Sequence, residues 1–354
     1  MFNRRASLYA ILFIALTSCS KDDILTSQSA SESDNSQMWW PFPKKNGGGG
    51  GDDGGSDSVF KLTAFGFVQE QSGNKLPQDH IDETIGQMKK ANVTLTRVNI
   101  SLSKGYYNKS IDSYLSSGYH VQIIANWDGD GNGKRHFPTP GELEYFKSQA
   151  KAFFEYYAPY KDQIAFVAFE NEWDWQIINN DAILEDYLAE LAAVVPIGHQ
   201  YGIKVTDGGI TSTSLKRWTY SQLSGEEAEE WLDTYWVGLE EGYKYFSYSA
   251  LMNIINTYTD FVKNVDLDYS NVHWYNVNEC GYGFATATEK FRQACNKALT
   301  TCNEFYISTN SLYLFQQTVD EIKNGDPEVA VAYSGTDTDE KSVKLSDDML
   351  EVLN

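Results

Sequence analysis

The chain has 354 residues, of which 42% are hydrophobic and 14% aromatic, so it can form one large core rather than several small ones. Its formal net charge of −21 argues against nucleic acid as a partner and against adhesion to anionic lipid, because an acidic surface repels phosphate groups. The same charge makes a strongly acidic polysaccharide a less natural ligand.

The first 18 residues have the pattern of a secretory signal peptide. Arg4 and Arg5 precede an apolar run at residues 8–16, which is too short to span a bilayer permanently. Residues 16–19 then resemble a bacterial lipobox, which implies that Cys19 is lipidated and becomes the mature N-terminus. An ordinary signal peptide followed by an incidental cysteine is the alternative.

Residues 20–23 resemble the acidic export signals of surface lipoproteins in Bacteroidetes-type bacteria. This resemblance implies that the protein is anchored at the outer face of the outer membrane. Residues 19–58 are expected to form a flexible linker, because the Ser-, Asp- and Gly-rich part cannot bury enough apolar surface to fold. About 40 such residues have a reach of roughly 35 Å.

From residue 59 to residue 354, short apolar runs alternate with amphipathic segments of helical length, which is typical of βα units around a parallel sheet. The expected strands cover residues 60–68, 94–100, 120–126, 164–170, 203–207, 272–275, 305–309 and 329–333. The expected helices include residues 79–91, 142–157, 181–201, 286–300 and 312–323. Eight strands in about 300 residues predict an α/β fold, a single-domain (β/α)8 barrel. A doubly wound sheet is the competing fold, but no glycine-rich phosphate loop follows the first strand.

Two features lie outside the barrel pattern. The longest insertion, at about residues 211–268, follows strand five and contains an acidic run at residues 226–230 that is expected to be a solvated helix face. Apart from Cys19, the chain has Cys280, Cys295 and Cys302, which allow one disulfide but do not specify its pairing.

Strand four ends in an unusual polar and aromatic sequence. The apolar run to Phe169 is followed by Glu170, Asn171, Glu172 and Trp173. Such a pattern is typical of a buried parallel strand whose carboxyl end opens into a polar pocket. In barrel enzymes this end of the strands carries the active site.

Other strand ends carry groups of the kind found in sugar-binding sites, and all of them are expected to point toward one mouth. The groups expected to bind substrate are Arg97, Asn126, Trp127, Asn171, Trp173, Trp175, Asp207, His273, Trp274, Tyr275 and Asn310. All seven tryptophans of the folded domain, including Trp218, Trp231 and Trp236, lie at strand ends or in the long insertion. Flat aromatic faces suit the apolar faces of sugar rings, whereas packing of loops over the barrel is the alternative.

The order of Arg97 on strand two, Asn171-Glu172 on strand four and His273-x-Tyr275 on strand six resembles a clan-A glycoside hydrolase from about residue 59 to the end. The resemblance implies that Glu172 is the general acid/base and that the substrate is a polysaccharide or oligosaccharide. Retaining members of the clan also need a nucleophilic carboxylate on strand seven, about 5.5 Å from the acid/base.

Strand seven departs from that pattern. The nucleophile position falls on Thr309 by local pattern or on Asn310 by strand alternation, and neither residue is a carboxylate. Glu304 is expected at the beginning of the strand, about 20 Å from its other end at ~3.3 Å per residue, and so out of reach. The nucleophile is therefore predicted to be missing.

Three interpretations follow for function. In the first, the protein is a hydrolase in which Glu172 works with another carboxylate, by inversion across roughly 6.5 to 9.5 Å. In the second, it is a degenerate barrel that binds glycan without cleaving it. In the third, Glu172 is only a buried structural carboxylate. The candidates for the second carboxylate in the first interpretation are Asp207, Glu279, Asp128 and Glu70.

Two further hypotheses concern charged groups near the expected mouth. Without a nucleophile, Arg97 needs another partner, and Glu170 is the candidate because an unpaired buried charge is costly. Residues 128–133 match the first half of a calcium loop, with Asp128, Asp130 and Asn132 as ligands, but the twelfth position is Thr139 and the bidentate ligand is missing. An ordinary Asp-Gly turn is the alternative, and no other cofactor is expected.

Overall fold

The computed structural model describes residues 61–66, 78–127, 136–180, 182–240, 247–276, 283–307, 311–334 and 345–353. The chain divides into two units, Met1–Gly55 and Ser56–Asn354, and every described residue belongs to the second. The expectations for the signal peptide, Cys19 and the linker lie outside the described residues. Within the described residues, no helix combines the length and the apolar character needed to cross a bilayer.

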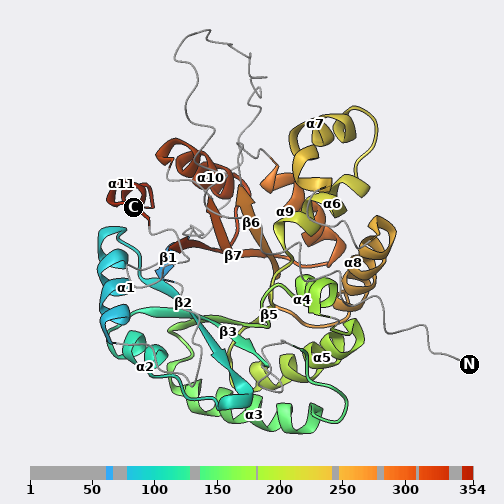
Figure 1. Cartoon of the computed structure of the whole chain (residues 1–354). Coiled ribbons are helices and arrows are strands. Elements are labelled where there is room, and N and C mark those ends of the chain that lie inside the picture. Colours follow the sequence, from blue (N-terminus) through green and yellow to red (C-terminus); the bar gives the residue numbers. More distant parts are fainter. Residues whose placement is uncertain are drawn as a thin grey trace, which may run out of the picture. The chain divides into compact units, whose positions relative to one another are not determined.

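The described part of Ser56–Asn354 is a (β/α)8 barrel, so the predicted fold class is confirmed (Figure 1). Its strands are β1 (Lys61–Gly66), β2 (Leu95–Ser101), β3 (His120–Asn126), β4 (Ile164–Phe169), β5 (Val205–Asp207), β6 (Ser270–Asn276), β7 (Thr300–Ile307) and β8 (Val329–Ser334). The helices are α1 (Gln78–Lys90), α2 (Lys109–Ser116), α3 (Leu143–Tyr157), α4 (Trp173–Asn180), α5 (Leu184–Gln200), α6 (Ser212–Ser221), α7 (Glu226–Glu240), α8 (Tyr248–Val262), α9 (Phe284–Ala294), α10 (Leu312–Asn324) and α11 (Asp347–Val352). Figure 1 shows the helices as a ring around the strands.

All strand pairs are parallel and fall into two four-stranded sheets, β1-β8-β7-β6 and β2-β3-β4-β5. At the junction of β5 and β6 the ladder is reduced to one bridge between Ile210 and Val272, with the Ile210 N–H donating to Asn271 O and the His273 N–H donating to Ile210 O. The two half-barrels are therefore joined here by a short contact just beyond the end of β5.

Side-chain alternation divides the core into two layers. Phe166 and Ala168 of β4 belong to a small cluster inside the barrel, whereas Val167 and Phe169 belong to the large cluster between strands and helices. Successive side chains of a strand point to opposite faces, so this division follows from the sequence of each strand. The same rule decides which residues near the carboxyl end of a strand can reach the mouth.

Strand seven begins five residues earlier than predicted. Helix α9 ends at Ala294 and is followed by Asn296 in the left-handed conformation, with φ of 54°. Asparagine tolerates this conformation better than most residues, and it is a common way to end a helix. The expected helix at residues 286–300 therefore ends too late, and for this reason the strand after it was predicted too close to the C-terminus. As a result, Glu304 lies well inside β7 rather than at its beginning.

The long insertion after β5 forms α6, α7 and α8. The acidic run occupies the first turn of α7, where its glutamates are exposed, so the interpretation as a solvated helix face is confirmed. Negative charge in the first turn is favourable because the amino end of a helix dipole is positive.

Candidate active site

The carboxyl end of β4 reverses sharply and presents two polar residues. Glu170 and Glu172 both have left-handed φ values, 65° and 54°. Such conformations in residues other than glycine cost about 1–3 kcal/mol each and concentrate at functional sites. The turn is held by hydrogen bonds from the Glu170 N–H to Ala125 O and from the Glu172 N–H to Gly208 O, each 3.0 Å long. Because hydrogen bonds to the neighbouring backbone hold Glu170 and Glu172 in these strained conformations, we take this turn as a candidate site.

Glu172 of this turn meets three side chains from two strands, His273 and Tyr275 of β6 and Glu304 of β7. The Tyr275 hydroxyl lies 2.6 Å from Glu172 Oε1 and 2.8 Å from Glu304 Oε1. His273 Nδ1 lies 2.8 Å from the same hydroxyl and 3.2 Å from Glu172 Oε1. Because the hydroxyl has one hydrogen, it can donate to only one carboxylate at a time. The two glutamates are therefore linked through a single tyrosine oxygen.

Arg97 of β2 fixes the position of Glu304. Its Nη1 donates to Glu304 Oε2 at 2.6 Å and to the Asn303 carbonyl at 2.8 Å, while its Nη2 donates to Asn171 Oδ1 at 2.8 Å. The Arg97 side chain is fully buried and that of Glu304 is 11% exposed, so the pair is screened little by water. The hypothesis that Arg97 pairs with Glu170 is wrong, because the Glu170 carboxylate instead accepts the Trp127 N–H at 2.5 Å.

The prediction that strand seven provides no carboxylate is also wrong. Glu304 reaches the mouth because β7 begins at Thr300 and Phe305 packs against the helices, so alternation turns Glu304 inward, opposite His273 in the register. The ladders on both sides of β7 are also irregular, with register shifts at Asn271/His273 and at Cys302/Phe305.

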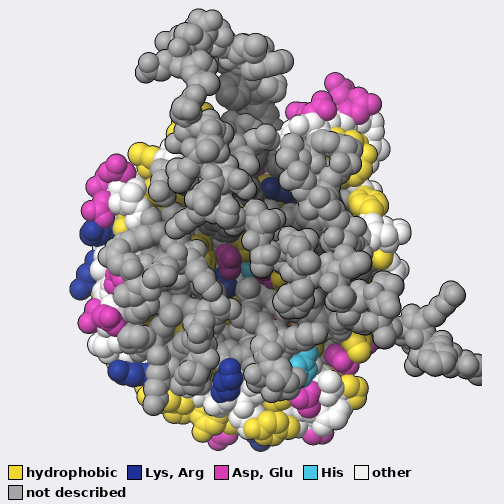
Figure 2. Space-filling view, viewed as in Figure 1, with side chains coloured by type: hydrophobic (Ala, Val, Ile, Leu, Met, Phe, Trp, Pro, Cys, Tyr) yellow, Lys and Arg dark blue, Asp and Glu magenta, His cyan; other side chains and the backbone are white. Residues whose placement is uncertain are grey.

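The two carboxylates are close enough for a double displacement. One oxygen of Glu172, one oxygen of Glu304 and one nitrogen of His273 all lie within 4.8 Å of one another. Retaining glycosidases place their carboxyl groups about 5–5.5 Å apart, whereas inverting ones need roughly 6.5–9.5 Å to hold a water molecule. Figure 2 shows acidic, basic and histidine side chains together at the bottom of a hollow in the face seen in Figure 1. The separation favours direct attack by one carboxylate.

Protonation in this cluster follows from burial and from the neighbouring charges. Burial by itself raises the pKa of Glu172, but the hydrogen bond and charge of His273, with Tyr275 and Arg97, outweigh it and lower that pKa. Burial by itself lowers the pKa of His273, but its contact with Glu172 and the charges of both glutamates raise it. In the free site these two directions favour the proton on His273, whose Nδ1 lies 3.2 Å from Glu172 Oε1 and can pass it to Glu172. Burial and the two carboxylates raise the pKa of Tyr275 well above its ordinary value, so its hydroxyl stays protonated.

Most of the tryptophans expected at the mouth lie elsewhere. Trp127, Trp173 and Trp274 are at most 2% exposed and belong to the layer between strands and helices, as do Trp218 and Trp231. Trp274 stands between His273 and Tyr275 on β6, so alternation turns it toward the helices, where it contacts Phe284. The prediction that these rings stack on sugar is wrong. Among the described side chains Trp175, 43% exposed, stays available for such a contact.

Strand alternation also places two further predicted residues, Asn126 and Asp207, on different sides of the barrel wall. Asn126 shares the inner face of β3 with Ile124, and its buried Oδ1 has no hydrogen-bond partner among the described residues. Asp207 instead shares a face with Val205 and lies on the helix side, where its carboxylate accepts the N–H groups of Gly209 (2.7 Å) and Asn271 (3.4 Å). The expectation that Asp207 binds substrate or serves as the second carboxylate is wrong.

The buried Asp207 gives a test of this placement through stability. Burial raises its pKa from 3.8 to about 6. The folded chain then binds the proton more tightly than the unfolded chain, so unfolding free energy falls as pH rises from about 4 to about 6, by about 3 kcal/mol in all. We expect Asp207→Asn, which cannot ionise, to lose this dependence. Between pH 4 and pH 8 the unfolding free energy of the unmodified chain should fall by about that amount, whereas that of the variant should not fall with it. Chemical denaturation at both pH values measures the difference.

Asp260→Asn, which removes an exposed carboxylate on α8, is the control for the loss of one negative charge. An equal difference between Asp207→Asn and the unmodified chain at pH 4 and pH 8 would contradict the buried placement.

The glycine pair after β5 allows the close approach of β4 and His273. A Cβ on Gly208 would lie 2.5 Å from Glu170 O, and one on Gly209 would lie 2.6 Å from both Cδ2 and Nε2 of His273. Gly209 also has φ of 81°, which side chains other than glycine rarely adopt. The site therefore depends on Gly208 and Gly209, neither of which is among the residues predicted from the sequence.

We expect Gly209→Ala to lower the unfolding free energy by about 1–3 kcal/mol, from backbone strain, and to reduce activity because His273 must move. Gly86→Ala is the matched control: a Cβ there meets nothing within 4 Å inside α1, and alanine favours a helix by about 0.5–1 kcal/mol. Thermal melting of both variants gives the comparison. Unchanged stability and activity in Gly209→Ala would contradict the contact.

Several predictions fall outside the described residues. They are Asn310, the calcium ligands Asp128, Asp130 and Asn132, and the candidate second carboxylates Glu70 and Glu279. The side chain of Trp236 and Cys280 are also not described. Cys295 and Cys302 are buried free thiols and are not bonded to each other.

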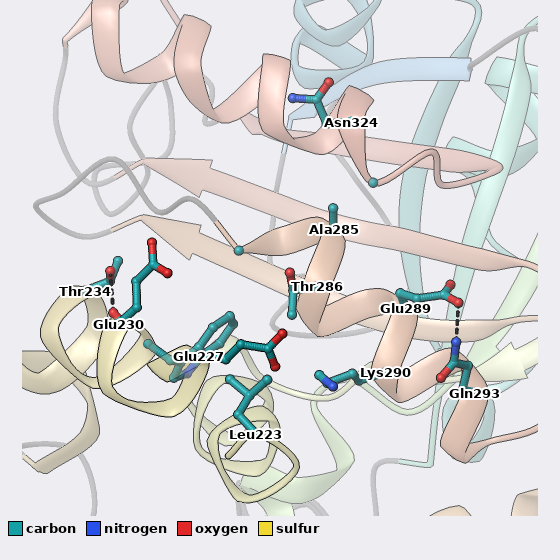
Figure 3. A pocket seen from close by; sticks show the side chains of 13 residues that line it. Leu223, Glu227, Glu230, Thr234, Ala285, Thr286, Glu289, Lys290, Gln293 and Asn324 are labelled. Atoms are coloured by element: carbon teal, nitrogen blue, oxygen red, sulfur yellow. Dashed lines mark hydrogen bonds between the residues drawn. The ribbon is translucent and has the colours of Figure 1, made fainter. Parts of the chain in front are cut away.

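A cavity of about 930 Å³ lies away from this site, between α7, α9 and the end of α10 (Figure 3). Its lining includes Glu227, Glu230, Glu289, Lys290 and Gln293. Figure 3 shows the hydrogen bond from Gln293 Nε2 to Glu289 Oε1. None of the residues predicted to bind substrate lines this cavity, so it is separate from the candidate active site.

Comparisons with known proteins support the fold. No protein-family model and no curated protein sequence matches the chain. Solved structures similar to it include a glucosidase from Croceicoccus marinus (TM-score 0.56, 12% identity, covering 80% of this chain and 61% of that one). Another is a family 39 glycoside hydrolase from Bacteroides cellulosilyticus (TM-score 0.53, 13% identity, covering 84% and 63%). The chain thus spans less than two thirds of either protein. These neighbours are clan-A glycoside hydrolases with TIM barrels, and at such identity the likeness establishes the fold alone.

Proposed function

We propose that the protein is a retaining glycoside hydrolase in which Glu304 is the nucleophile and Glu172 the general acid/base. The observation that carries this proposal is the approach of both carboxylates to one tyrosine hydroxyl, with one oxygen of each within 4.8 Å of the other. This separation is closer to the 5–5.5 Å of retaining enzymes than to the roughly 6.5–9.5 Å of inverting ones, so the retaining arrangement is favoured.

The geometry assigns a task to each side chain. Arg97 occupies Glu304 Oε2 and leaves Oε1 directed toward the mouth, where it attacks the anomeric carbon. As the bond from that carbon to the leaving oxygen breaks, Glu172 gives its proton to the leaving oxygen. Glu172 then takes a proton from water, which attacks the same carbon and releases Glu304. His273 can supply Glu172 with its proton across their 3.2 Å contact, and the Tyr275 hydroxyl donates to the charged Glu304.

The substrate class is proposed from the polar groups at the mouth. Asn171 is fixed by Arg97, the Oδ1 atom of Asn126 has no partner among the described residues, and Trp175 is partly exposed. Amides suit sugar hydroxyls, and an exposed indole suits the apolar face of a pyranose ring. We infer that the ligand is a neutral oligosaccharide or polysaccharide, because the acidic chain disfavours an acidic one.

The test is the stereochemistry of hydrolysis. The intact chain is incubated with a panel of neutral and acidic glycans, and the first anomer released from any cleaved substrate is followed by proton nuclear magnetic resonance. We expect release of the anomer that has the configuration of the cleaved bond. Release of the opposite anomer would overturn the assignment of Glu304.

A glycan-binding protein without catalysis was the alternative interpretation. It was based on the absence of a carboxylate from strand seven, whereas Glu304 of β7 lies 2.8 Å from the Tyr275 hydroxyl, which supports the hydrolase instead. The same panel tests it, because a binder would be retained by a polysaccharide in an affinity gel without releasing reducing ends.

We also propose that the chain is anchored through a lipid on Cys19 and displayed at the surface of the outer membrane, where other glycan-uptake proteins are its expected partners. The support is the lipobox-like sequence at residues 16–19 and the acidic residues after it. Incorporation of labelled palmitate into the chain, its loss in Cys19→Ala, and digestion of the chain by protease added to whole cells are the expected results. Labelling of Cys19→Ala would contradict the anchor.

A further inference from the structure

Glu172, His273 and Glu304 form a compact cluster of two carboxylates and one imidazole. Their ligand atoms all lie within 4.8 Å of one another. No other such group of three potential metal-ligating side chains is found among the described residues. We propose that this cluster binds one divalent transition-metal ion of the Zn²⁺ type, in competition with a sugar. Zinc is commonly held by three ligands drawn from histidine and carboxylate, with a fourth position left open.

One distance in the cluster already suits a small tetrahedral ion, and the Glu304 oxygen would have to move closer to complete the site. Zinc bonds of about 2.0–2.2 Å place neighbouring ligand atoms roughly 3.3–3.5 Å apart. Glu172 Oε1 and His273 Nδ1 are already 3.2 Å apart. The Tyr275 oxygen lies 2.6–2.8 Å from those two atoms and from Glu304 Oε1, and so occupies the space between all three. The metal would take that space, and the tyrosine hydroxyl would move aside.

Charge and access favour a cation. Two carboxylates face a single guanidinium in the cluster, and the side chains of Glu172 and Glu304 are 21% and 11% exposed, so an ion can reach them. Arg97 holds Glu304 Oε2 and leaves Oε1 as a ligand. Carboxylate ligands in metal sites are commonly oriented by such outer hydrogen bonds.

The structure also limits the affinity and the choice of metal. His273 Nε2 has no hydrogen-bond acceptor among the described residues, and outer partners of a ligating histidine contribute about 10–100-fold in affinity. We therefore expect a dissociation constant on the order of micromolar rather than nanomolar. Calcium and magnesium are hard cations that prefer oxygen ligands, whereas one of the three ligands here is the imidazole of His273, so neither ion should compete with zinc.

The experiment is calorimetric titration of the intact chain with zinc chloride alone, at neutral pH and without substrate. We expect one zinc ion per chain and at least about 10-fold weaker binding in Glu304→Gln and in His273→Asn, each of which removes one ligand. His199→Ala is the matched control, because His199 contacts Asp268 and Asp266 at the surface and could collect zinc adventitiously. Its zinc binding should equal that of the unmodified chain.

Tyr275→Phe tests the site without removing any of the three ligands. Removal of the hydroxyl from the centre of the cluster should tighten zinc binding by roughly 10-fold, the scale of one hydrogen bond to a charged group. Absence of zinc binding, retention of full affinity in Glu304→Gln, or equal affinity in Tyr275→Phe would each overturn the proposal. Because no sugar is present, the result is independent of whether the protein proves to be a glycoside hydrolase.

Discussion

Replacement of Glu304 by glutamine should reduce glycoside hydrolysis by a factor on the order of 10⁴ to 10⁶, the range seen when an enzymatic nucleophile is removed. The amide has nearly the same shape and keeps an oxygen for Arg97, but it is too weak a nucleophile to attack the anomeric carbon. The loss should appear with every substrate, whatever its leaving group, because formation of the first covalent bond is lost. Initial rates on the best glycan of the panel measure the effect.

Glu289→Gln, an exposed substitution of the same kind on α9, is the control and should hydrolyse the glycan normally. A second variant identifies the function of Glu304 directly. Glu304→Ala leaves space for azide, which can attack the anomeric carbon from the vacated side and give a glycosyl azide of inverted configuration. Hydrolysis by Glu304→Gln at a rate near that of the unmodified chain would show that another group is the nucleophile.

Replacement of Glu172 by glutamine should reduce hydrolysis by about 10²–10⁴-fold, the usual contribution of a general acid/base. This loss should depend on the leaving group. An aryl glycoside whose phenol leaves without protonation should form the glycosyl-enzyme at a nearly normal rate, whereas a natural glycan should not. Burst kinetics on the aryl substrate and steady rates on the glycan separate the two steps.

Azide distinguishes the two glutamates. In Glu172→Ala it should attack the covalent intermediate on Glu304 and give a glycosyl azide of retained configuration, opposite to the product expected from Glu304→Ala. The same loss with aryl and natural substrates would show that Glu172 does not protonate the leaving group.

The arrangement of elements could be derived from the chain because it depends on local periodicity. Strand β3 was predicted at its observed bounds, and most other strands within two residues at each end, since apolar runs bounded by turns specify a buried parallel strand. Strand β7 was the exception. Its position depended on where α9 ends, and that end is set by Asn296 in a left-handed conformation rather than by any break in the amphipathic pattern.

The positions of Arg97, His273 and Tyr275 could also be predicted, because strand alternation and parallel order bring their faces together. Alternation applied to the tryptophans would have corrected a further expectation. A tryptophan between two inward residues, such as Trp274, must face the helices, so its presence near the mouth in sequence does not place it in the mouth.

The barrel, the acidic character and the place of Glu172 at the end of strand four follow from composition and short-range pattern, so they could be predicted from the chain. Which carboxylate faces Glu172 could not, because it depends on the fold. Glu304 faces it because β7 begins soon after α9 ends and pairs with β6 so that Glu304 lies opposite His273. Glycine is likewise required at positions 208 and 209 because a side chain there would clash with the Glu170 carbonyl and the His273 ring, which lie far away in the sequence. Contacts between residues about 30 to 200 positions apart in the chain have no local signal, and these contacts make the site.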